Sequence, residues 1–198
     1  MKRIVTMSIC LFIASSAMAV LTQPIADVAT SQQGQLGLSG GFSIESDVTL
    51  YGVRGSYGLM DGISVFGGLG LVEINDLDSE VYVQGGGTYQ LPVDLPVDLA
   101  LRGGLGFMSA DDYDIMTVNG GALASMAIQE ALTIYVFGGL SYSKIEIDYG
   151  EWGDDSETET DLALAGGAIF AVTPNMAIYG ELAMIDELFI SGGLKMTL

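Results

Sequence analysis

The chain has 198 residues, and 49% of them are hydrophobic, yet 25 acidic residues stand against 6 basic ones and the net charge is −19. So negative a balance argues against nucleic acid and other polyanions as partners. The sequence contains no histidine, the residue that most often serves as a general base and as a transition-metal ligand. We therefore expect a protein without enzymatic activity and without a cofactor.

The first segment has the features of a secretory signal peptide. Two basic residues precede the apolar stretch 4–13, and small residues favour cleavage between Ala19 and Val20. The apolar stretch is too short to span a bilayer as a helix. The pattern predicts that residues 1–19 are a cleaved signal peptide and that the mature chain is exported. Residues 20–34, which contain a proline and a polar run, are expected to form a periplasmic tail.

From residue 35 onward, short segments alternate apolar and polar residues. In the clearest run, Leu99, Leu101 and Leu105 share one face, whereas Asp98, Ala100 and Arg102 share the other. Such alternation indicates strands that meet two different environments. The expected strands are 35–44, 47–59, 62–73, 80–91, 97–108, 115–128, 132–147, 161–173, 176–185 and 187–198. Residues 35–198 are thus predicted to form one all-β domain, a closed antiparallel up-and-down transmembrane β-barrel of about ten strands, with eight as the alternative.

The connections between these strands are of two kinds. Short turns fall near residues 60–62, 91–96, 129–131 and 174–175, and they alternate with acidic connections. Outer-membrane barrels keep their periplasmic turns short and place longer loops outside. The acidic connections are therefore expected at the outer end, and residues 150–160, which carry no apolar pattern, are expected to form the longest loop.

Two residue types support a depth map of the barrel. Glycine pairs recur near the middle of most strands, with one glycine facing lipid and its neighbour facing the lumen. They are expected to relieve crowding in a small closed sheet. Tyr57 and Tyr89 face outward just before short turns, as in an aromatic girdle, and Tyr51 and Tyr142 are candidates for the opposite girdle.

Four charged residues are candidates for a polar network in the lumen: Arg54, Arg102, Glu181 and Lys195. Strand parity turns each of them away from lipid. An arginine facing the hydrocarbon midplane would cost roughly 2–4 kcal/mol, so the inward placement is the favourable one. Two interpretations follow, an ion-paired core that fills the barrel or a path for translocated solutes.

Most acidic residues fall at the outer rim, where they serve solubility or bind cations collectively. Ca²⁺ and Mg²⁺ prefer oxygen ligands, but no loop has the spacing of an EF-hand, so no metal site is assigned. Weak contacts with divalent cations at the rim are expected to involve Asp76, Asp78, Asp111, Asp112, Asp114, Asp154 and Asp155.

The signal peptide, the turn at 57–62 and the Gly-Gly-Leu-Gly strands resemble the small outer-membrane β-barrel proteins of Gram-negative bacteria. The resemblance implies a multi-pass barrel in the outer membrane, contact with outer-membrane lipids and insertion by the outer-membrane assembly machinery. It implies no particular substrate.

The function favoured by these observations is a structural or surface-interaction barrel with a largely filled lumen. A narrow channel for small solutes or ions is the first alternative, because open aqueous channels are associated with many more strands. A soluble secreted β-sandwich is the second, since its strands would also alternate.

Overall fold

The structure, a computed structural model, describes residues 33–44, 48–74, 79–110, 113–148, 154–185 and 187–198. Within these ranges, no helix is long and apolar enough to cross a membrane. The predicted signal peptide, its cleavage site at Ala19 and Val20, and almost all of the predicted tail lie outside the described residues.

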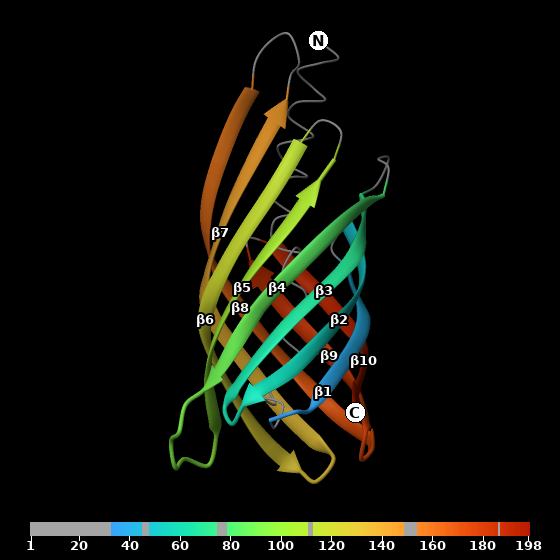
Figure 1. Cartoon of the computed structure of the whole chain (residues 1–198), viewed down its shortest axis with the longest axis vertical. Helices are drawn as coiled ribbons and strands as arrows, with labels where there is room; N and C mark the ends of the chain where they lie inside the picture. Colours follow the sequence, from blue (N-terminus) through green and yellow to red (C-terminus); the bar gives the residue numbers. More distant parts are fainter. Residues whose placement is uncertain (1–32, 45–47, 75–78, 111–112, 149–153, 186) are drawn as a thin grey trace.

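The ten strands of the structure form one closed antiparallel barrel in which each strand pairs with its neighbours in sequence and β1 pairs with β10 (Figure 1). Their bounds are β1 (Leu36–Ile44), β2 (Val48–Met60), β3 (Ile63–Ile74), β4 (Glu80–Gln90), β5 (Asp98–Ser109), β6 (Tyr113–Gln129), β7 (Leu132–Asp148), β8 (Asp154–Thr173), β9 (Met176–Ile185) and β10 (Glu187–Thr197). The predicted fold is confirmed. The eight-strand and β-sandwich alternatives are wrong, because all ten strands belong to one closed sheet.

Alternation along each strand separates an outward apolar face from an inward face. Leu101 is 49% exposed whereas its neighbour Ala100 is 3% exposed, as their parity predicts. The tyrosines expected in the two girdles, Tyr51, Tyr57, Tyr89 and Tyr142, are all exposed on the outer wall. A continuous apolar outer wall is what a closed sheet needs in order to sit in lipid.

The strand register fixes how the inward residues of different strands are offset from one another in depth. A row of directly paired residues runs from Lys195 through Ser39 and Arg54, and onward to Glu159 of β8. In the other direction the same row reaches Ala171, twelve residues further along β8. This stagger corresponds to a strand tilt of roughly 35–45°. Inward residues of distant strands are thereby brought to a common level.

One predicted boundary is wrong. The expected loop at 150–160 is in part a strand, because β8 begins at Asp154 and pairs with β7 from there on. The physical reason is that this part of the hairpin needs no apolar face, since backbone pairing with β7 is enough to order it. At the other described strand ends, the predicted and observed bounds agree within two residues.

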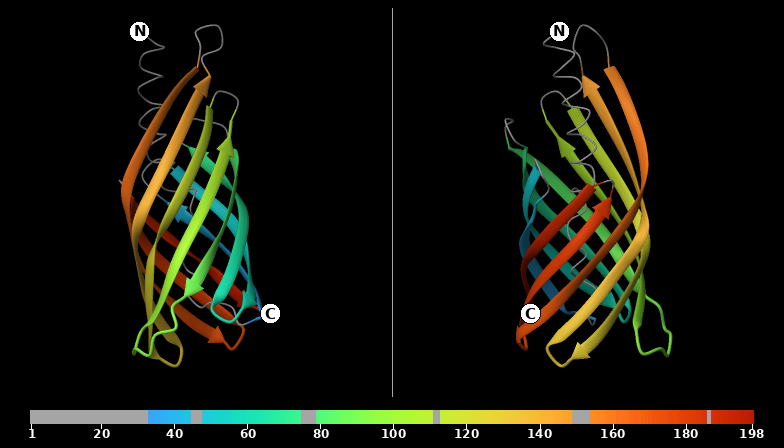
Figure 2. Two further views of the ribbon diagram at one scale, coloured as in Figure 1. Left: turned by 60° about the vertical axis from the view of Figure 1, so that its left-hand side comes forward. Right: turned by 180° about the vertical axis from the view of Figure 1, so that it is seen from behind.

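The barrel is taller on one side than on the other. Strands β6, β7 and β8 have 17, 17 and 20 residues, and they rise above the shorter strands at one end (Figures 1 and 2). The four short turns and the C-terminus lie at the opposite end. We call these the outer end and the short-turn end.

Candidate functional site

The outer half of the lumen contains an apolar layer. Its side chains come from strands β2 to β7 and from β10, and several have no solvent exposure at all. The members of this outer apolar layer are Val48, Leu50, Val72, Tyr82, Met108, Ile115, Ile145 and Phe189. They pack together because each is an inward residue near the outer end of its strand.

Below the outer apolar layer, two arginines share one aromatic ring. Arg54 of β2 and Arg102 of β5 are 4% and 6% exposed and face inward. Their Cζ atoms lie 4.7 and 4.4 Å from the centre of the Phe66 ring. A guanidinium over an aromatic face gains cation–π attraction, which strengthens when water is excluded. Phe66 therefore links two like charges that would otherwise repel each other.

Glu181 supplies the negative charge of this layer. It is 4% exposed, and its Oε2 accepts a hydrogen bond of 2.5 Å from the Tyr135 hydroxyl. The Tyr135 hydroxyl also interacts electrostatically with Arg102, and the Tyr179 hydroxyl interacts with both Arg54 and Glu181. The Tyr135 hydroxyl is thus hydrogen-bonded to the carboxylate, and each tyrosine lies close enough to a guanidinium to experience its charge. We call Arg54, Phe66, Arg102, Tyr135, Tyr179 and Glu181 the charged layer.

Lys195, the fourth candidate, is half-buried rather than fully buried. It borders a cavity of about 270 Å³ at the short-turn end, whose polar lining includes Gln90, Asp98 and Ser125. The Gln90 Nε2 donates to Asp98 Oδ1 at 3.4 Å. The structure therefore gathers three candidates in the charged layer and places the fourth at the mouth of this cavity.

Inward glycines make room for the aromatic side chains of the lumen. A Cβ added at Gly121 would lie 2.7 Å from Phe137 Cζ and 2.7 Å from the Gly139 Cα, closer than real Cβ atoms come. At the neighbouring outward Gly120 the nearest atom would be 3.6 Å away, an ordinary contact. Most glycine pairs thus combine an inward member that leaves no room for a side chain with a tolerant outward one, and Gly103–Gly104 is an exception.

We expect Gly121→Ala to lower the free energy of unfolding by about 1–3 kcal/mol, the usual cost of overpacking, because the ring and a neighbouring strand both obstruct the new methyl group. Gly120→Ala is the matched control and should change stability little. Urea titration of both variants in lipid vesicles measures the difference. Equal midpoints would mean that the lumen can repack around a methyl group at this level.

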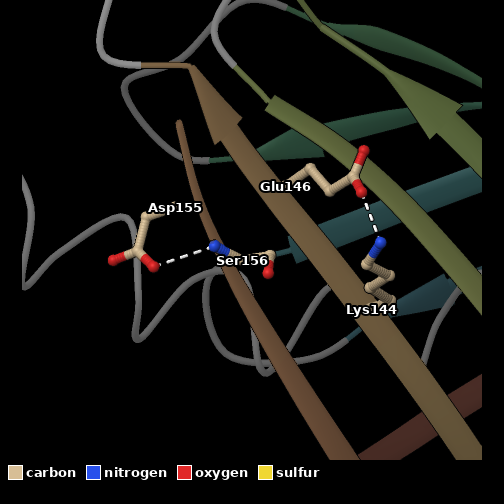
Figure 3. Close-up of polar contacts among 4 residues, drawn as sticks. All are labelled: Lys144, Glu146, Asp155 and Ser156. Atoms are coloured by element: carbon tan, nitrogen blue, oxygen red, sulfur yellow. Dashed lines mark hydrogen bonds and ion pairs between the residues drawn. The ribbon is translucent and has the colours of Figure 1, made fainter. Parts of the chain in front are cut away.

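The acidic candidates at the outer rim are only partly described. Asp76, Asp78, Asp111 and Asp112 lie outside the described residues, as does the side chain of Asp154. Asp114 is half-buried in β6, and Asp155 is exposed in β8. Among the described residues, no group of three or more His, Cys, Asp or Glu is arranged to hold a metal ion. On the outward face of β7, Lys144 forms an ion pair with Glu146 (Figure 3).

Sequence reasoning missed Phe66 and Tyr135 as members of the charged layer. Both are inward aromatic residues, and parity alone was sufficient to show that they face the lumen. Their partners lie on other strands, however, so the stagger of the register was needed to pair them with Arg54, Arg102 and Glu181.

An even number of strands, a closed antiparallel sheet and an apolar outer wall define a transmembrane β-barrel of the bacterial outer membrane. The family model described as "Outer membrane protein beta-barrel domain" matches residues 9–192. The chain belongs to this family of Gram-negative barrels and is an outer-membrane protein. Comparison with curated proteins finds no match.

Solved structures similar to this chain are also outer-membrane barrels. The translocator domain of the autotransporter NalP from Neisseria meningitidis is 11% identical with a TM-score of 0.51, over 99% of this chain and 97% of that one. The N-terminal β-barrel domain of Pseudomonas aeruginosa OprF is 13% identical with a TM-score of 0.43, over 84% and 98%. Ail of Yersinia pestis is 16% identical with a TM-score of 0.40, over 84% and 100%. At such identities the likeness concerns the fold alone.

Proposed function

We propose that this protein is a non-enzymatic outer-membrane barrel with a structural or surface-interaction role, and that its lumen is closed to solutes. Its outer wall would contact outer-membrane lipids, and the outer-membrane assembly machinery would insert it. The proposal includes contacts of the acidic rim with divalent cations, which would bind collectively, since no described group of three or more His, Cys, Asp or Glu is arranged to hold a metal ion.

The outer apolar layer carries the proposal of a closed lumen. Leu50, Tyr82, Met108 and Ile115 come from four different strands and are 0% exposed. An apolar constriction resists the entry of water and therefore of hydrated ions. The charged layer beneath it adds a second obstruction, in which bulky side chains are held by cation–π contacts and a hydrogen bond.

Single-channel recording in planar bilayers tests the closed lumen. The wild-type protein should be silent, whereas Leu50→Ala combined with Met108→Ala should produce discrete openings because it removes side chains from two sides of the apolar layer. Val53→Ala, on the outer wall of β2, is the matched control and should stay silent. Steady conductance of the wild-type protein would contradict the closed lumen.

The second candidate function is a narrow channel, and the cavity beside Lys195 favours it. This cavity of about 270 Å³ gives the short-turn end a recess whose lining mixes apolar residues with polar ones, Lys195 among them. If the wild-type protein conducts, Lys195→Gln should reduce selectivity for anions, because it removes a positive charge at the mouth.

A further inference from the structure

Within the described part of the chain, the outer half of β8 pairs with a strand on one side only, and we call its other side the free edge. Residues 154–170 of β8 pair with β7, but pairing with β9 begins only at Leu164. No described strand pairs with the other side of residues 154–163. Figure 1 shows this part of β8 rising beyond the short strands β9 and β10, with β7 on one side and no labelled strand on the other. An unpaired strand edge offers a row of backbone donors and acceptors that a further strand can use.

The register shows which residues of β8 point to this edge. The Ala171 N–H donates to the Ala131 carbonyl next to β7, and the pairing with β7 continues without a shift up to Asp154. Antiparallel strands bond to each neighbour through alternate residues, so the odd-numbered residues bond to β7. Ser156, Thr158 and Thr160 therefore direct their N–H and C=O groups to the free edge.

One backbone donor of this edge already has a substitute partner. The Ser156 N–H donates to Oδ1 of its own neighbour Asp155 at 2.8 Å (Figure 3). This is the donor that a neighbouring strand would use if one were present. A carbonyl of an incoming strand can replace the carboxylate at this position, since the local bond holds no other element in place.

Along this edge, acidic side chains alternate with hydroxyl side chains. Four carboxylates lie on the lumen side of β8, because their direct partners on β7 belong to its inward face. The pairs are Asp155 with Ile147, Glu157 with Ile145, Glu159 with Ser143 and Asp161 with Ser141. The intervening residues on the opposite face are Ser156, Thr158 and Thr160. The edge thus combines free backbone groups with negative charge at every second residue.

We propose that the outer edge of β8, residues 154–163, binds an extended cationic segment of another protein by adding it as a strand. Main-chain hydrogen bonds then supply affinity, and alternate side chains supply specificity. The complementary segment carries Lys or Arg at every second position, so that these cations lie opposite the four carboxylates. A second copy of the chain is a poor occupant, because symmetric pairing of two β8 edges sets carboxylates on one face against carboxylates.

This proposal deepens the surface-interaction role and rests on it, since it requires the outer end to be accessible from outside. It does not require the lumen to be closed. Conductance of the wild-type protein would overturn the closed lumen and leave the edge unaffected, whereas failure of the edge to bind would leave the lumen closed. The two proposals can therefore fail separately.

Fluorescence anisotropy with a synthetic peptide tests the proposal. The probe is an eight-residue peptide with blocked ends and alternating lysine and threonine, added to the full-length barrel in zwitterionic lipid nanodiscs. We expect saturable binding that weakens with salt. A peptide of the same composition with its four lysines in one block should bind at least tenfold more weakly, because consecutive strand residues point to opposite faces.

Two sets of variants separate strand addition from general attraction between charges. Thr158→Pro removes a backbone donor from the free edge and none of the bonds to β7, so it should weaken binding at least tenfold relative to Thr158→Ala. Glu157→Gln combined with Glu159→Gln should also weaken it. A fully N-methylated alternating peptide retains the charges but no backbone donor, and should fail to bind the wild-type protein.

Equal binding of the alternating, block and N-methylated peptides would overturn the proposal. It would show that the edge attracts the peptides by its overall negative charge and not by strand addition. Absence of binding to the alternating peptide would overturn it as well. Self-association of the barrel through residues 154–163, seen as a dimer that Thr158→Pro dissolves, would assign the edge to a second copy and would also refute it.

Discussion

Glu181→Ala should lower the free energy of unfolding by about 3–5 kcal/mol, the usual cost of removing one member of a buried charge network, and by less where luminal water reaches the site. Glu181 is a buried carboxylate in the same layer as two buried guanidiniums, and it accepts the hydrogen bond of Tyr135. Its loss leaves Arg54 and Arg102, which both contact the Phe66 ring, without that negative charge, and it takes the acceptor from the Tyr135 hydroxyl.

Urea titration in lipid vesicles measures this loss, and Glu181→Gln is the control. Glutamine keeps the volume and an acceptor for Tyr135 but removes the charge, so its effect should lie between those of the wild type and the alanine variant. Ala183→Gly, two residues further along the same face of β9, reports on loss of packing alone. If all four proteins unfold at the same urea concentration, the charged layer does not stabilise the barrel.

Much of the fold could be predicted from the sequence because a membrane barrel repeats one simple rule. Each strand meets lipid on one side and the lumen on the other, so polarity alternates with a period of two. The inward positions of Arg54, Arg102 and Glu181 follow from this rule. Contacts across the lumen do not follow from it, because they depend on the twelve-residue stagger, which no single strand encodes. Phe66 and Tyr135 emerged only when the register was known.

The outer half of β8 was missed for the opposite reason. Above the membrane both faces of a strand can meet water, and apolar alternation then disappears although the backbone pairing persists. The sequence still alternates there, with acids at 155, 157, 159 and 161 and hydroxyl side chains between them. An analysis based on hydrophobic residues does not detect this period of two. The alternation of acidic and hydroxyl residues made the strand hard to recognise from hydrophobic periodicity, and the same alternation gives its edge a regular pattern of negative charge.

Val53→Arg should lower the free energy of unfolding in lipid by roughly 2–4 kcal/mol, the cost of an arginine on the lipid face near the bilayer midplane. Val53 is 57% exposed on the outer wall of β2, and it lies between the outward Tyr51 and Tyr57 of the same strand. If these tyrosines mark the two girdles, position 53 lies on the lipid-facing wall between them, whereas a position beyond Tyr57 lies among the headgroups.

Leu59→Arg is the matched control, because Leu59 is on the same strand and the same face and is 47% exposed, but lies beyond Tyr57 toward the short turn. An arginine there reaches the headgroups, so it should cost only about 0–1 kcal/mol. Urea titrations of both variants in lipid vesicles give the two values. Equal losses of stability in the two variants would show that Tyr57 does not mark the girdle near the short turns. A negligible loss of stability for Val53→Arg would place this part of β2 outside the hydrocarbon. A large difference would fix the membrane position on the barrel and leave the outer half of β8 in water, where its edge is open to a partner.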